Sequence, residues 1–244
     1  MKKVIKAFIP PIIIYALNRL NKKNRNRRNL PDKNLYRPLF SPWCSTTFSE
    51  MYLMLQPHTL VDAKRAWVLY TLAQQALHLP GDFWEMGVYR GGTALLLNHV
   101  LTAKNPDKTL HLFDTFCGMP ATKAEFDYHK QGDFADTQLE NVKKLFNGSQ
   151  QVQFHAGYIP ETFAGLEHHK ISLAHIDVDI HQSVLDCCNF IYPRLTTGGF
   201  MIFDDYGFPS CPGARKAVDD YFKDKVERPL ILENGQAIII KTTC

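Results

Sequence analysis

From residue 60 onward, apolar runs of strand length alternate with stretches whose apolar residues recur at helical spacing. The apolar runs predict strands at 82–88, 109–115, 151–156, 172–178 and 198–205. The helical spacing predicts helices at 60–79, 91–103, 136–146, 161–166, 182–194 and 212–224. Repeated strand–helix units of this kind imply a mostly parallel sheet with helices on both faces.

The C-terminal segment PLILENGQAIIIKT (229–242) holds two apolar runs joined by Asn234-Gly235, a dipeptide typical of tight hairpins. This hairpin is expected to add one antiparallel strand to the sheet. The addition separates the chain from a standard dinucleotide-binding fold and favours the α/β, Rossmann-like architecture of many methyltransferases.

The charge is distributed unevenly along the chain. Residues 1–40 hold 11 Lys and Arg and a single acid, Asp32, whereas the remainder holds 17 bases and 23 acids. We therefore predict a basic N-terminal arm at 1–40 and a catalytic domain at 41–244. Because the body of the protein is acidic, nothing in its charge indicates a nucleic-acid-binding core.

The N-terminal arm allows more than one role. Its uncharged run, 7–17, has 11 residues and is shorter than the ~20 that a membrane-spanning helix needs, and no signal-peptide cleavage site follows it. Residues 1–30 could lie on an anionic membrane surface as a peripheral contact. Alternatively, the apolar part packs on the body of the protein or on a second subunit of a homo-oligomer.

The six cysteines, at positions 44, 117, 187, 188, 211 and 244, include no C-x-x-C pair. This spacing argues against a structural zinc site and against a disulfide framework, and it favours a reducing compartment. We expect a cytoplasmic protein, with peripheral membrane contact as the arm's alternative.

The stretch WEMGVYRGG (84–92) places glycines directly after the first strand, and Asp114 ends the second strand. Its G-x-x-x-G-G spacing differs from the dinucleotide fingerprint and lacks the Lys-Ser/Thr of a nucleotide-phosphate loop. A glycine turn followed by an acid that can bind ribose hydroxyls indicates an S-adenosylmethionine site. The predicted donor-binding residues are Glu85, Gly87, Tyr89, Arg90, Gly91, Asp114 and Gly157.

Four aspartates follow the two strands that are expected to be neighbours: Asp177 and Asp179 after one, Asp204 and Asp205 after the other. Carboxylates this close repel one another unless a cation neutralises them. Oxygen ligands of this kind suit Mg²⁺, Mn²⁺ or Ca²⁺. The predicted ligands are Asp177, Asp204 and Asp205; the alternative is that Asp179 caps a helix and Asp205 a turn.

Histidines and the segment 116–133 complete the candidate site. His181, just beyond the aspartates, could act as a general base, as could Asp179, whereas His175 lies within a strand and is interpreted as structural. The pair His168-His169 is interpreted as solvated surface. The polar segment 116–133 is too long for an ordinary connection, and with Tyr128, His129 and the following Phe134 it is predicted to cover the acceptor.

Seven segments carry a resemblance to a known family: EMGVYRGGTALLL, LFDTFCGMP, GDFADTQLENVKKLF, HAGYIPETF, HIDVD, GGFMIFDDYG and PGARKAVDDYF. In this order the chain resembles the macrocin O-methyltransferase (TylF-like) family, which methylates sugar hydroxyls, over about residues 60–230. The resemblance implies a class I methyltransferase fold, S-adenosylmethionine as donor and a bound Mg²⁺. It also implies donor contacts at Glu85, Gly87, Gly91 and Asp114 and metal ligands at Asp177, Asp204 and Asp205.

Two positions depart from the family pattern near the expected acceptor side. The family usually has Leu-Tyr and a following Pro where this chain has Ile180-His181-Gln182-Ser183, and an acid where Cys117 stands. The sequence thus predicts a Mg²⁺-dependent O-methyltransferase acting on a sugar-containing small molecule. The alternatives are methylation of a phenolic or catechol-like hydroxyl, or a non-catalytic partner in a polysaccharide-assembly complex.

Overall fold

The computed structural model describes residues 41–104 and 107–243. The predicted basic arm, with its membrane and subunit alternatives, lies outside the described residues. Among those that are described, no helix is both long and apolar enough to cross a membrane.

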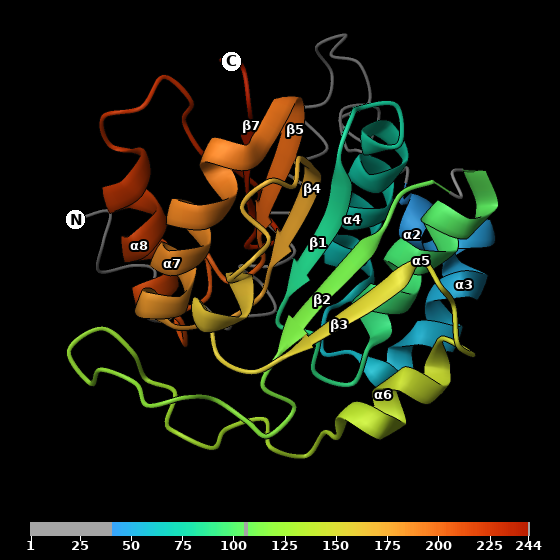
Figure 1. Ribbon diagram of the computed structural model, residues 1–244, viewed down its shortest axis with the longest axis horizontal. Coiled ribbons are helices and arrows are strands. Elements are labelled where there is room, and N and C mark those ends of the chain that lie inside the picture. Colours follow the sequence, from blue (N-terminus) through green and yellow to red (C-terminus); the bar gives the residue numbers. More distant parts are fainter. Residues whose placement is uncertain (1–40, 105–106, 244) are drawn as a thin grey trace, which may run out of the picture. The chain divides into compact units, whose positions relative to one another are not determined.

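Within the described residues, seven strands form one sheet in the order β3-β2-β1-β4-β5-β7-β6 (Figure 1). The strands are β1 (Asp82–Met86), β2 (Leu110–Asp114), β3 (Val152–Ala156), β4 (Ile171–Ile176), β5 (Leu195–Phe203), β6 (Leu230–Ile231) and β7 (Ala237–Ile240). Strands β1 to β5 are parallel, while β7 runs antiparallel to β5 and β6 antiparallel to β7. The predicted mixed sheet is confirmed, except that the hairpin contributes two strands rather than one.

From α4 onward the helices alternate with the strands as the sequence predicts, whereas α2 and α3 were not predicted. They are α2 (Pro42–Ser45), α3 (Thr47–Leu55), α4 (Ala63–Ala76), α5 (Gly92–Lys104), α6 (Leu139–Leu145), α7 (His181–Ile191) and α8 (Pro212–Phe222), with short 3₁₀ turns η3 (Gln56–His58), η4 (Glu161–Phe163) and η5 (Tyr192–Arg194). The helix predicted at 161–166 is only the turn η4, since the chain turns away at Gly165, whose φ is +84°.

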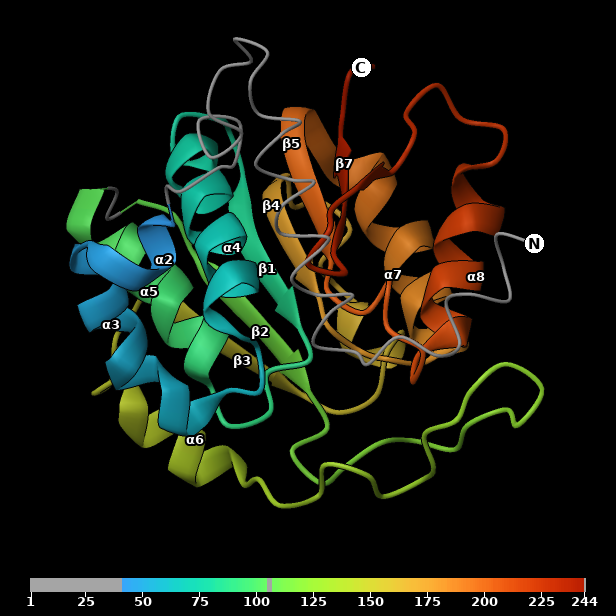
Figure 2. The same cartoon turned by 180° about the vertical axis from the view of Figure 1, so that it is seen from behind.

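Side chains that alternate along each strand build two cores, one on each face of the sheet. Phe83 and Leu112 point to a cluster that includes the buried residues of α4 and α5. Trp84 and Phe113 point to the opposite cluster, which includes those of α7 and α8. Figures 1 and 2 show α4 and α5 on one face and α7 and α8 on the other. Burial on both faces explains why the central strands read as continuous apolar runs.

The strand order reverses between β1 and β4, so that connections leave the sheet in opposite directions there. In open α/β sheets such a switch point opens a crevice at the carboxyl ends of the strands. Gly87 lies directly beyond β1 with a φ of +87°, and a Cβ built on it would be 1.8 Å from the carbonyl oxygen of Asp177. Glycine is therefore required for the chain to pass the end of β4 so closely.

We predict that Gly87→Ala lowers the free energy of unfolding by about 3 kcal/mol or more, because the methyl group collides with backbone at a left-handed position. Gly165→Ala is the matched control: its φ is +84° and nothing lies within 4 Å of its Cβ position. The control should lose only the conformational cost of about 1–2 kcal/mol. Urea denaturation checks both, and equal losses would contradict the close-approach explanation.

Candidate active site at the carboxyl ends of the strands

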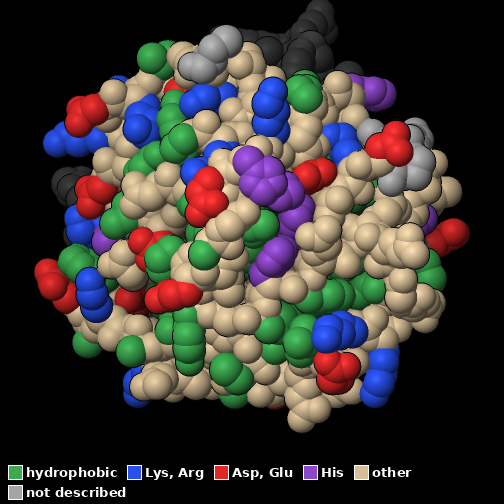
Figure 3. All heavy atoms as spheres, in the orientation of Figure 1, with side chains coloured by type: hydrophobic (Ala, Val, Ile, Leu, Met, Phe, Trp, Pro, Cys, Tyr) green, Lys and Arg blue, Asp and Glu red, His purple; other side chains and the backbone are tan. Residues whose placement is uncertain are grey.

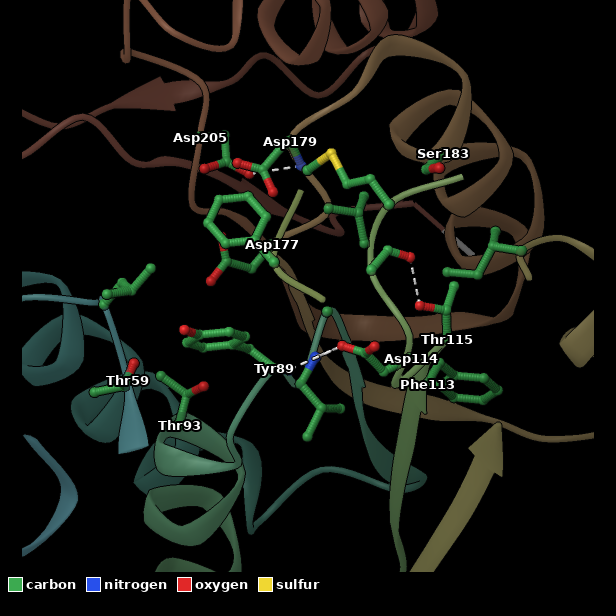
Figure 4. Close-up of a pocket in the computed structure, with 18 of the residues that line it drawn as sticks. Thr59, Tyr89, Thr93, Phe113, Asp114, Thr115, Asp177, Asp179, Ser183 and Asp205 are labelled. Atoms are coloured by element: carbon green, nitrogen blue, oxygen red, sulfur yellow. Dashed lines mark hydrogen bonds between the residues drawn. The ribbon is translucent and has the colours of Figure 1, made fainter. Parts of the chain in front are cut away.

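A cavity opens at the carboxyl ends of the strands and is lined from β1, β2, β3, β4, β5 and the loop after β2 (Figure 4). Of the predicted site residues, those that line it are Gly87, Tyr89, Asp114, Gly157, Asp177, Asp179 and Asp205. Hydroxyl-bearing residues that the sequence analysis missed also line it: Thr59, Thr93, Thr115, Tyr158 and Ser183. The structure thus brings most of the predicted donor and metal residues to one cavity.

Asp114 organises the side of the cavity that is formed by the glycine turn. Its Oδ2 accepts hydrogen bonds from the backbone N–H groups of Val88 and Tyr89, both at 2.8 Å, and its Oδ1 accepts one from Phe116 at 2.7 Å. A carboxylate has about four acceptor positions, so about one is left for a ligand hydroxyl. The same side chain therefore shapes the glycine turn and faces the cavity.

Three predicted donor-binding residues lie outside the lining: Glu85, Arg90 and Gly91. Arg90 pairs with Asp136 at the surface. Gly91 has a φ of +89°, and a Cβ there would meet Val142 and Leu145 of α6 at 3.0 and 3.2 Å, so its role in this structure is to let the turn approach that helix.

The four aspartates converge at the ends of β4 and β5. The backbone N–H of Asp179 donates to Asp205 Oδ2 at 2.9 Å, and oxygens of Asp177 and Asp204 lie within 4.8 Å of each other. Burial, and then the negative charge of the neighbouring aspartates, raises the pKa of Asp177 and Asp205 well above the usual value. Figure 4 shows Asp177, Asp179 and Asp205 around the same part of the cavity.

Asp204 differs from the other three because its charge is compensated within the protein. Arg65 Nη1 donates to its Oδ2, while Gln236 Nε2 donates to Oδ1 at 2.7 Å and His175 Nε2 lies 3.5 Å from the same oxygen. Burial opposes its negative charge, but the hydrogen bond and charge of His175, followed by the charge of Arg65, hold the pKa of Asp204 below its usual value. Asp204 is fully buried and does not line the cavity.

Glu85 lies on the other side of His175, on β1. Its Oε1 is 2.9 Å from His175 Nδ1, and its Oε2 has no hydrogen-bond partner among the described residues. Burial disfavours the imidazolium, but hydrogen bonds to Asp204 and Glu85 and their charges outweigh it and raise the pKa of His175 to about 10. His175, predicted as structural, is the cation of a buried chain from Glu85 through Asp204 to Arg65, which we call the charge chain.

The segment after β2 folds against the ends of β4 and β5. Asp127 Oδ1 accepts a hydrogen bond from the backbone N–H of His181 at 2.8 Å, which caps the first turn of α7. The His181 ring stacks on Phe126 with centroids 4.5 Å apart, and its Nδ1 is buried without a partner among the described residues. His181, predicted as a base, does not line the cavity.

His129, on the same segment, is a residue whose role the sequence analysis left unassigned beyond covering the acceptor. Its Nδ1 is 3.1 Å from Asp133 Oδ2, and its Nε2 is 3.6 Å from Asp179 Oδ1. The Cys211 thiol donates to the same Asp179 oxygen at 3.4 Å. Asp179 is thus contacted by the segment after β2 as well as by Asp205.

Comparison with known protein families identifies the family of this chain. The profile of the macrocin O-methyltransferase (TylF) family matches residues 54–240, which include every strand of the sheet and the whole cavity lining. The chain belongs to this family. It is therefore a methyltransferase, and membership implies S-adenosylmethionine as its donor.

Two relatives are 32% identical to this chain over the residues that align. Mycinamicin III 3''-O-methyltransferase of Micromonospora griseorubida aligns over 180 residues, 67% of this chain and 70% of its own. The 8-demethyl-8-(2,3-dimethoxy-alpha-L-rhamnosyl)-tetracenomycin-C 4'-O-methyltransferase of Streptomyces olivaceus aligns over 178 residues, 67% of each chain. Both relatives are named for O-methylation.

Solved structures share the fold. The O-methyltransferase NovP superposes with a TM-score of 0.69 at 25% identity, covering 76% of this chain and 83% of its own. The calicheamicin methyltransferase CalS11 superposes with a TM-score of 0.64 at 20% identity, covering 80% and 93%. The sheet of this TylF-family chain is therefore that of the class I methyltransferases.

The substitution His175→Gln tests the charge chain. It leaves Glu85 and Asp204 buried without their shared imidazolium. We expect the free energy of unfolding to fall by about 3–5 kcal/mol, because unpaired buried charges are costly. The pKa of His175 is raised from 6.5 to about 10 on folding. Its stabilising contribution is thus complete below pH 6.5 and is lost as the pH rises toward 10.

Urea denaturation of both proteins across this pH range tests the assignment. Wild type should lose stability relative to His175→Gln as the pH rises from about 6.5 to about 10. Parallel pH curves for the two proteins would show that His175 is not the buried cation.

Proposed function

We propose that this TylF-family enzyme transfers a methyl group from S-adenosylmethionine to a hydroxyl of a sugar-containing small molecule, with a divalent cation at the aspartates. The observation that carries the proposal is the group of carboxylates that faces the cavity next to the glycine turn and Asp114. The substrates named for the relatives, a mycinamicin and a rhamnosyl-tetracenomycin, support a sugar-containing acceptor.

The donor side is formed by backbone and by one carboxylate. Gly87 and Gly157 let backbone approach a ligand without a side chain between, and Asp114 presents a charged acceptor to a ribose hydroxyl. When bound, S-adenosylmethionine supplies a methyl group already activated by its sulfonium. The protein's contribution is to hold the acceptor oxygen in line with that methyl group.

The aspartates fit a divalent cation. Asp177, Asp179 and Asp205 are three carboxylates with raised pKa values around one cavity, whereas the nearby cations Arg65 and His175 pair with Asp204. Hard oxygen ligands of this kind suit Mg²⁺. Such an ion, when bound, would lower the pKa of a coordinated sugar hydroxyl.

The geometry favours exchanging the predicted roles of Asp177, a metal ligand, and Asp179, a general base. The backbone N–H of Asp179 donates to Asp205 Oδ2, and both residues line the cavity, so these two carboxylates are the pair that would hold the ion. Asp204, predicted as a ligand, is buried away from the cavity and paired with Arg65 and His175, so it is not part of the proposed ligand set. Asp177 lines the same cavity, and its enclosed surroundings raise its pKa, which suits a carboxylate that accepts the hydroxyl proton. We propose Asp177 as the base, in place of Asp179 or His181.

Two alternative functions differ from this proposal in the acceptor or in the need for a methyl donor. A phenolic or catechol-like hydroxyl could be methylated by the same carboxylates, and a non-catalytic partner in polysaccharide assembly would need no donor. A panel of glycosides, nucleotide sugars and catechols with isotopically labelled donor separates them. Methyl transfer to sugar hydroxyls is expected; transfer confined to catechols, or no donor binding at all, would contradict the proposal.

The donor assignment predicts that Asp114→Ala weakens S-adenosylmethionine binding about tenfold or more, since a hydrogen bond to a charged acceptor contributes about 1.5–3 kcal/mol. Calorimetric titration measures this, and a melting curve checks that the glycine turn still folds. Asp224→Ala, at an exposed aspartate beyond α8, is the control and should bind normally. An unchanged affinity in Asp114→Ala would contradict the assignment.

The cation assignment predicts that Mg²⁺ raises the melting temperature saturably, because an ion bound by the native state stabilises it by mass action. Asp205→Asn should abolish this rise and methyl transfer, yet leave donor binding largely intact. Asp224→Asn, an exposed aspartate beyond α8, is the matched control and should behave as wild type. Full activity after exhaustive chelation would contradict a role for the cation.

A further inference from the structure

A second cluster of ligand-type side chains lies at the amino ends of the strands, on the face that α7 and α8 share. Asp82 begins β1, His111 is the second residue of β2, and His169 lies just before β4. The methyl-transfer cavity opens at the carboxyl ends of the same strands, so this cluster is separate from it. Figure 3 shows histidine side chains gathered near the middle of one face of the molecule.

The atoms of this cluster converge on one carboxylate oxygen. Asp82 Oδ2 is 3.6 Å from His111 Nε2 and 3.3 Å from His169 Nδ1. The other oxygen of Asp82, Oδ1, accepts the backbone N–H of Thr109 at 3.0 Å, which fixes the carboxylate. The His111 and His169 rings are 76° apart in plane, with centroids separated by 4.8 Å.

An unpartnered nitrogen points into the cluster. His111 is fully buried, and its Nε2 has no hydrogen-bond partner among the described residues. Its other nitrogen, Nδ1, is 3.0 Å from His155 Nε2. With a proton on Nδ1 shared with His155, the Nε2 lone pair of His111 faces the carboxylate, and an acceptor facing an acceptor is unfavourable unless a cation lies between them.

The two histidine contacts of Asp82 Oδ2 differ: His169 Nδ1, at 3.3 Å, is within hydrogen-bonding distance, whereas His111 Nε2 is not. A separation of 3.6 Å is longer than an N–H···O hydrogen bond. Around a tetrahedral zinc ion with bonds of about 2.0–2.1 Å, ligand atoms are about 3.3–3.4 Å apart. In zinc sites a ligating histidine also typically donates a hydrogen bond from its second ring nitrogen, as His111 Nδ1 is placed to do toward His155 Nε2.

We propose that Asp82 Oδ2, His111 Nε2 and His169 Nδ1 bind one Zn²⁺, with His155 orienting His111. The side chain of His111 is wholly buried, while those of His169 and Asp82 are 22% and 23% exposed. The ion thus reaches the site from solvent, and a water completes its coordination. The ion would join β1, β2 and the segment before β4. The pair His168-His169 in that segment was interpreted from the sequence as solvated surface.

The test uses the full chain without a histidine tag, stripped by a chelator and titrated with Zn²⁺ against a chromophoric competitor. His169→Ala should weaken binding more than about 100-fold, since loss of a ligand exceeds the 10–100-fold cost of losing an orienting group. His168→Ala removes the exposed neighbour and is the matched control, expected to bind as wild type. Asp82→Asn gives an independent loss of one charged ligand.

A third group, His129, Asp179 and Cys211, could also hold a metal ion, and Cys211→Ala distinguishes it. Wild-type chain loaded with Co²⁺ should show visible absorption without a thiolate charge-transfer band, and Cys211→Ala should retain the Zn²⁺ affinity. A change of less than tenfold in His169→Ala, or loss of binding in Cys211→Ala, would overturn the proposal.

Discussion

The buried charge chain is the interaction on which the active site depends. Glu85, His175, Asp204 and Arg65 join β1, β4, β5 and α4 through charged contacts beneath the cavity. A buried carboxylate without a partner would be protonated or would destabilise the fold. The imidazolium of His175 pairs with both Glu85 and Asp204, and Asp204 holds Arg65 at the start of α4 against the end of β5.

The four aspartates at the ends of β4 and β5 differ in whether a positively charged side chain of the protein pairs with them. Asp204 is neutralised from within the protein, whereas Asp177, Asp179 and Asp205 face the cavity with raised pKa values. Carboxylates so arranged repel one another, and the proposed cation would relieve that repulsion. The tight passage at Gly87, against the backbone of Asp177, places the glycine turn directly beside these carboxylates.

Much of the fold and site follows from local sequence. Apolar runs and helical spacing predict the strands and helices closely, and Gly87, Asp114 and the paired aspartates stand where strand ends predict them. Contacts between side chains that lie far apart in the sequence could not be predicted from local patterns. Arg65 and Asp204 are separated by 139 positions, and His169 and Asp82 by 87, so only the strand order brings them together.

We propose that a divalent cation and the donor meet at the ends of β1, β2, β4 and β5. Crystals grown with S-adenosylhomocysteine and Mn²⁺, measured at the manganese edge, would locate both. We expect an anomalous peak within ligand distance of Asp179 and Asp205, with the ribose of the nucleoside against Asp114. An anomalous map with no peak among the four aspartates, or a nucleoside bound away from Asp114, would contradict it.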